Sequence, residues 1–122
     1  MILVDTSVWI DHLHRAERRL VEHLEADLVG FHPSVVDELA LGTIRGRSEF
    51  LELLGRLRPF PVLTHAELMA LVDQRKLWGR GLSAVDAHLI GSVLLAPEAV
   101  LWTRDRCLER VAEELTLPLV TE

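Results

Sequence analysis

Two acidic residues follow short apolar runs near the two ends of the chain. Asp5 comes directly after the run Ile2–Val4, and Asp105 lies just beyond the run Val100–Trp102. Such runs predict buried strands, and in open α/β folds the functional side chains gather outside the carboxyl ends of the strands. Both acids are therefore candidates for one site, although each would also serve as the N-cap of the next helix, a position that favours Asp.

A third acid, Asp86, lies on the apolar face of a predicted helix. At helical spacing it shares a stripe with Leu89, Ile90 and Val93. A carboxylate on an apolar face needs a partner, because burial of an unpaired charge is very unfavourable. A bound cation would be one such partner, and a capping box with Ser83 in the first turn would be another.

The fourth candidate, Glu38, is followed one turn later on the same helix face by Gly42. A small residue at that position leaves room above the carboxylate for a metal ion or a phosphate backbone. A surface Glu beside a C-cap Gly gives the same pattern, and the neighbouring Asp37 competes for any metal role.

Together the four acids indicate a site for a hard cation. Carboxylates brought within a few ångströms of one another raise one another's pKa unless a cation neutralises them. Ligand sets made only of oxygen favour Mg²⁺ or Mn²⁺. Water acidified by such an ion can attack a phosphodiester, so the pattern predicts metal-assisted phosphodiester hydrolysis.

The elements that must position these acids alternate along the chain. Five short strands are expected, at Ile2–Val4, Leu28–Phe31, Phe60–Leu63, Val100–Trp102 and Pro118–Val120. Helices are expected over residues 7–26 with a break near 14–17, and over 33–42, 48–57, 64–77, 83–95 and 105–115. Short apolar strands that alternate with helices predict an α/β fold whose parallel sheet is covered on both faces.

Length and composition are those of one domain. The chain has 122 residues, 49% of them hydrophobic, so residues 1–122 are expected to form a single domain with one core. No apolar run approaches the roughly 20 residues that span a bilayer, and the N-terminus lacks the basic region of a signal peptide. The single cysteine, Cys107, excludes an internal disulfide and a cysteine-based zinc cluster. These features favour the cytoplasm.

The net charge of −6 is unusual for a nucleic-acid binder, because phosphate contacts dominate the affinity of such proteins. An acidic net charge is compatible with nucleic-acid binding if the acids are concentrated at a metal site, where the cation reverses the local field. Otherwise the protein does not bind nucleic acid. Basic residues gather in two stretches, Arg45–Arg58 and Arg75–Arg80. These stretches would hold a phosphate backbone or form solvated helix faces.

In order and spacing, the acidic motifs resemble those of PIN domains. Asp5-Thr-Ser-Val-Trp-Ile resembles the first PIN motif, and Glu38-Leu-Ala-Leu-Gly42 resembles the second. Leu82-Ser-Ala-Val-Asp86-Ala-His-Leu-Ile resembles the third, and Leu101-Trp-Thr103-Arg-Asp105-Arg-Cys-Leu resembles the fourth. The resemblance covers the whole chain, whose length is similar to that of VapC-type toxins.

This resemblance implies a PIN-like three-layer α/β/α fold with a parallel sheet of about five short strands, and endoribonuclease activity with Mg²⁺ or Mn²⁺. It implies that the catalytic metal site consists of Asp5, Glu38, Asp86 and Asp105. Supporting hydroxyls would come from Thr6, Ser7 and Thr103, for which helix capping or turn hydrogen bonds are the alternative. The implied partners are an RNA substrate, a cognate antitoxin protein whose tail covers the active site, and a second copy in a homodimer.

Several side chains are expected to serve these partners. RNA would be held mainly by arginine, with Arg80, Arg104 and Arg106 nearest to the acids in sequence, unless the last two pair with neighbouring acids. A groove lined by Trp9, Leu13, Leu51 and Leu54 would receive an apolar antitoxin helix, unless these residues belong to the core. The six histidines are interpreted as surface or packing residues.

The alternative to an enzyme is a non-catalytic PIN-fold protein-binding module in which the acids are caps and surface charges. The presence of all four acids argues against it, because such a module has no need to bring negative charges together. Mn²⁺ or Mg²⁺ would stabilise the enzyme against heat and leave the module unchanged, since a ligand that binds only the folded state stabilises that state.

Overall fold

Four short strands, all parallel to their neighbours, lie at the centre of the fold in a computed structural model that describes residues 1–122. Strand β1 (Ile2–Val4) pairs with β4 (Val100–Trp102), and Leu3 lies opposite Leu101. Strand β2 (Gly30–Phe31) pairs with β3 (Arg58–Pro59). A single bridge between Ile2 and Val29 joins the two pairs.

The sheet differs from the expected five strands. The strand predicted at Phe60–Leu63 lies earlier, at Arg58–Pro59, and the one predicted at Pro118–Val120 is reduced to a bridge between Leu119 and Leu101. Prolines explain both differences, because they lack the N–H that a ladder needs. Phe60 still donates to the carbonyl of Phe31, but Pro61 cannot continue the pairing, and Pro118 takes part only as an acceptor for Leu101.

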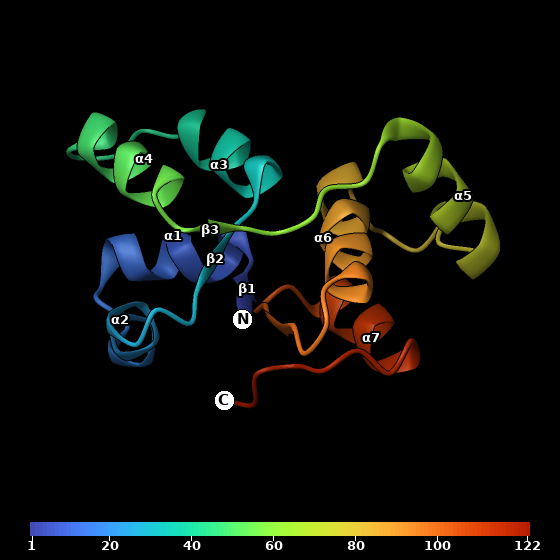
Figure 1. Cartoon of the computed structure of the whole chain (residues 1–122). Coiled ribbons are helices and arrows are strands. Elements are labelled where there is room, and N and C mark those ends of the chain that lie inside the picture. Colours follow the sequence, from blue (N-terminus) through green and yellow to red (C-terminus); the bar gives the residue numbers. More distant parts are fainter.

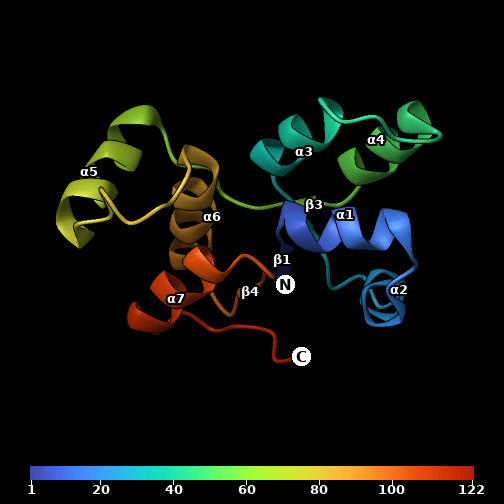
Figure 2. The ribbon, with the colours of Figure 1, turned by 180° about the vertical axis from the view of Figure 1, so that it is seen from behind.

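Seven helices cover the strands: α1 (Thr6–His14), α2 (Arg18–Glu25), α3 (Pro33–Ala40), α4 (Arg47–Gly55), α5 (His65–Arg75), α6 (Ala84–Leu95) and α7 (Arg106–Glu114). Helices α1 to α4 lie on one side of the strands and α5 to α7 on the other (Figures 1 and 2). The break predicted near residues 14–17 is confirmed, since α1 ends at His14 and α2 begins at Arg18. No helix has the length and apolar composition needed to cross a membrane.

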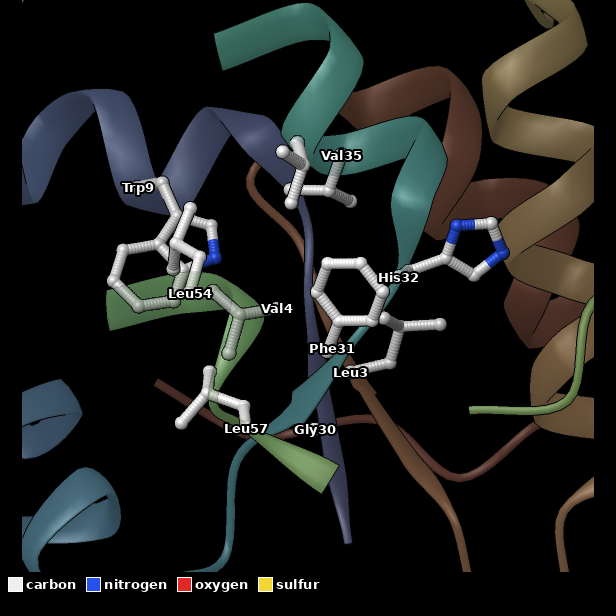
Figure 3. A pocket seen from close by; sticks show the side chains of 10 residues that line it. Leu3, Val4, Trp9, Gly30, Phe31, His32, Val35, Leu54 and Leu57 are labelled. Carbon is white, nitrogen blue, oxygen red and sulfur yellow. The ribbon is translucent and has the colours of Figure 1, made fainter. Parts of the chain in front are cut away.

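The largest buried side chain is Trp102 at the end of β4. Trp9 and Leu54, predicted to line an antitoxin groove, are also core residues, and each is only 3% exposed. They lie with Val4 and Val35 around a void of about 10 Å³ (Figure 3). That volume holds one water molecule at most, so the groove predicted from these two residues does not exist at this place.

Candidate active site

Asp5 lies where β1 ends, and its side chain is buried. Its Oδ2 accepts hydrogen bonds from Ser7 Oγ at 2.7 Å and from Thr103 Oγ1 at 2.8 Å. Although Asp5 occupies the N-cap position of α1, its side chain makes no capping bond. The carboxylate is therefore held by hydroxyls rather than by the helix, and its Oδ1 receives no hydrogen bond from the protein.

The hydroxyls of Ser7 and Thr103 also connect the ends of β1 and β4. Thr103 Oγ1 accepts from the backbone N–H of Asp105 at 3.0 Å, and Ser7 Oγ accepts from the backbone N–H of Arg104 at 3.0 Å. The hydroxyl of Thr6 points elsewhere and donates to Glu38 Oε1 at 2.7 Å. All three predicted supporting hydroxyls thus contact a predicted site residue, directly at an acid side chain.

Asp105 and Glu38 are exposed, and they lie at the start of α7 and on α3, on opposite sides of the strands (Figure 1). Asp105 is the N-cap of α7, and its Oδ1 accepts from the backbone N–H of Leu108 at 3.0 Å. The alternative capping role considered for Asp105 is therefore also present. Glu38 lies in the last turn of α3, and together with Gly42 it lines a groove of about 360 Å³.

Asp86 is the residue on which the other acids act most clearly. It completes a capping box with Ser83, whose N–H donates to Oδ2 at 2.9 Å. Burial raises the pKa of its carboxyl, and the negative charges of Asp5 and Asp105 raise it further, against the lowering effect of the bond from Ser83. Asp5 and Asp105, which are far from Asp86 in sequence, therefore lie close enough to Asp86 for their charges to act on its carboxyl.

The four acids share a pattern of hydrogen bonding. In each carboxylate one oxygen is held by a hydroxyl or a backbone N–H, while the other oxygen has no protein donor. None of the four forms an ion pair with Arg, Lys or His. No three His, Cys, Asp or Glu side chains lie close enough together to enclose an ion. The donors nevertheless fit Mg²⁺, which typically takes one or two carboxylates and keeps several waters.

The arginines predicted to hold RNA differ in their pairing. Arg80 pairs with Glu114, whereas Arg104 pairs with three acids, Asp11, Glu17 and Glu122. Arg106 is exposed at the first position of α7 and forms no ion pair. The alternative that these arginines pair with acids therefore applies to Arg104 and does not apply to Arg106.

His32 was predicted only as a surface or packing residue. It is 2% exposed, and its side chain also makes specific hydrogen-bond contacts that were not predicted. Its Nδ1 caps α3 by accepting from the backbone N–H of Ser34 at 3.0 Å, and its Nε2 lies 3.0 Å from Ser92 Oγ on α6. Pro33 gave a usable signal, because Pro at the first helical position makes the preceding residue the N-cap.

Acid is expected to destabilise the protein through His32. Burial lowers its pKa from 6.5 to about 4, His88 adds to the lowering, and Asp37 opposes it. The unfolded chain therefore takes up a proton that the folded chain rejects. The stability contribution is complete above pH 6.5 and is lost as the pH falls toward about 4, with a slope of at most about 1.4 kcal/mol per pH unit.

Urea unfolding from pH 7 to pH 4 measures this effect. The free energy of unfolding of the wild type should approach that of a His32→Asn variant as the pH falls, because only the wild type loses the contribution of the neutral ring. A gap between the two proteins that stays constant with pH would contradict the assignment.

Comparison with known proteins agrees with the resemblance seen in the motifs. Ribonuclease VapC32 of Mycobacterium tuberculosis is 56% identical to this chain over 122 residues, which are 100% of the chain and 98% of that protein. The values are the same for the proteins of strain CDC 1551 / Oshkosh and strain ATCC 25618 / H37Rv. The PIN domain family matches residues 2–114, a span that contains all four acids. On this match the chain belongs to the PIN domain family.

Proposed function

We propose that the protein is a Mg²⁺- or Mn²⁺-dependent endoribonuclease and the toxin of a VapBC-like toxin–antitoxin pair. The observation that carries the proposal is that the charges of Asp5, after β1, and Asp105, after β4, both act against the charge of Asp86 in the first turn of α6. Like charges that lie close together destabilise the fold unless a ligand of opposite charge binds to them. The name of the full-length relative, a ribonuclease, supports the same reaction class.

Asp5, Glu38, Asp86 and Asp105 would hold the ion, either directly or through the waters that it keeps. When bound, the ion would supply acidified water and stabilise the charge that develops on the phosphate. Ser7 and Thr103 donate to Oδ2 of Asp5 and leave its Oδ1 without a hydrogen bond. Thr6 donates to Oε1 of Glu38 and leaves Oε2 without one. Bound in this way, the carboxylates need little rearrangement to meet a cation.

The partners follow from the same proposal. RNA would approach the exposed side of Asp105, with Arg106 as the nearest unpaired cation in sequence. A cognate antitoxin would use the groove beside Glu38, which is lined by Ile10, Leu13 and Gly42 among others. Of the four groove residues predicted from the sequence, only Leu13 lines it. The toxin would act in the cytoplasm as a homodimer.

Incubation of the purified protein with a mixed cellular RNA pool tests the activity. Discrete fragments are expected with Mg²⁺ or Mn²⁺, and no cleavage is expected with EDTA. The Asp37→Asn variant is the matched control for variants of the four acids. It removes an exposed acid next to Glu38 and should cleave RNA as the wild type does. Cleavage that persists in EDTA would contradict the proposal.

The second candidate is a non-catalytic protein-binding module. It is favoured by one observation, that Asp86 and Asp105 do cap their helices. Thermal unfolding separates the two candidates, since a module without a metal site should melt at the same temperature with and without Mn²⁺. If the protein binds the metal, a free metal concentration of about 100 times Kd would instead stabilise the folded state by about 2.7 kcal/mol.

A further inference from the structure

His32 connects the two helices that carry Glu38 and Asp86. The backbone N–H of Ser34 in the first turn of α3 donates to Nδ1, and Nε2 contacts Ser92 Oγ in α6. Figure 3 shows the ring of His32 pointing away from Trp9 and Leu54 and toward α6. His32 and Ser92 are both buried, so no bulk water competes for these contacts.

The two contacts require one form of the ring. A donated N–H from Ser34 needs a lone pair on Nδ1, so the proton of the neutral ring lies on Nε2 and is donated to Ser92 Oγ. A protonated ring carries hydrogen on both nitrogens and would lose the bond from Ser34. Burial keeps the ring neutral at pH 7, since it lowers the pKa of His32 to about 4.

The contacts of His32 lie on the same two helices as Glu38 and Asp86, so they affect the distance between these acids. Glu38 lies six residues after His32, and Asp86 lies six residues before Ser92. Each separation is about 9 Å along a helix axis. Both helices can therefore be traced from the contact with His32 to an acid, and a small change of angle at His32 becomes a larger change in the distance between the acids.

We propose that His32 is a positioning residue that sets the separation between Glu38 and Asp86 by linking Ser34 of α3 to Ser92 of α6. The effect on catalysis rests on the nuclease function proposed above. The separation itself is a property of the folded chain alone and can be measured without metal or RNA.

Two variants break the link from opposite ends. Ser92→Ala removes the contact with α6 and leaves the cap of α3 in place. His32→Asn keeps an N-cap side chain for α3 and loses the reach to Ser92. Val93→Ala is the matched control, because Val93 is a buried neighbour of Ser92 on α6 that lies outside the link.

Double electron–electron resonance reports the geometry directly. Spin labels are attached to Leu41→Cys at the C-cap of α3 and to Ala84→Cys at the first position of α6, both exposed, with Cys107→Ser to remove the native thiol. The distance distribution is expected to shift or broaden in Ser92→Ala and in His32→Asn, and to stay unchanged in Val93→Ala. An unchanged distribution in both link variants would overturn the proposal.

Metal affinity and kinetics report the consequence. In each link variant the Kd for Mn²⁺, measured by calorimetry, should rise about tenfold, and kcat for RNA should fall by a similar factor with KM unchanged. The double variant should lose no more than either single variant, because both break one link. A shifted distance with wild-type Kd and kcat would overturn the role in catalysis.

Failure of the proposed function looks different. A wild-type protein that neither binds Mn²⁺ nor cleaves RNA would refute the nuclease, whereas the spin-label distances would still decide whether His32 sets the spacing of the two helices.

Discussion

An Asp5→Asn variant is expected to fold as the wild type does and to lose at least about a thousandfold in kcat for RNA cleavage, which corresponds to several kcal/mol of transition-state stabilisation by the metal. The reason lies in the two hydroxyls. Ser7 and Thr103 both donate to Oδ2 of Asp5, so the amide oxygen of Asn must take that place. Its NH₂ group then replaces Oδ1 and presents hydrogens where the wild type presents a free carboxylate oxygen.

The measurement is a single-turnover cleavage rate at saturating Mg²⁺, with circular dichroism to check the fold. Asp5→Ala is the companion variant, and it should also be less stable by about 1–3 kcal/mol, because it leaves the buried hydroxyl of Thr103 and the partly buried hydroxyl of Ser7 without their acceptor. Asp37→Asn controls for the loss of one negative charge on the protein. A rate for Asp5→Asn within tenfold of the wild type would show that Asp5 is a structural residue.

The positions of the acids could be predicted because they depend on local rules. An Asp after a buried parallel strand lies at the carboxyl edge of the sheet, whatever else the chain does. For Asp86 the sequence left two alternatives, a site acid and a capping box with Ser83, and the structure shows the capping box together with the effect of the Asp5 and Asp105 charges. For this residue the structural and the functional interpretations are compatible.

The contacts between distant segments could not be predicted. Whether Trp9 lines a groove or fills the core depends on how α4 packs against α1, and periodicity in one helix does not contain that information. The contact of the His32 ring could not be predicted for the same reason, because its partner Ser92 lies 60 residues away in the sequence. The strand limits were predicted wrongly for a simpler reason, because the prolines at 61 and 118 were not taken as ends of the pairing.

Asp86→Asn is expected to change stability and activity in opposite directions. In EDTA at pH 7.5 the variant should melt higher than the wild type by about 2–4 °C. Burial and the charges of Asp5 and Asp105 disfavour the ionised carboxyl of Asp86, and Asn removes that charge while its oxygen keeps the bond from Ser83. RNA cleavage should fall by at least about a hundredfold, because a ligand of the metal is lost.

The dependence on pH identifies the cause. The pKa of Asp86 is raised above its usual 3.8 in the folded protein, so the penalty is present when the group is ionised and disappears as the pH falls through the raised value. The advantage of Asp86→Asn in EDTA should therefore shrink on acidification, while Mn²⁺ should stabilise the wild type and reverse the order of melting. Ser83→Ala is the matched control, which loses a cap of about 1 kcal/mol without changing the charge. A metal-free Asp86→Asn protein that melts below the wild type at pH 7.5 would contradict the prediction. It would mean that the carboxylate stabilises α6 as a cap by more than its buried charge destabilises the fold, and that the charges of Asp5 and Asp105 do not make this a cation site.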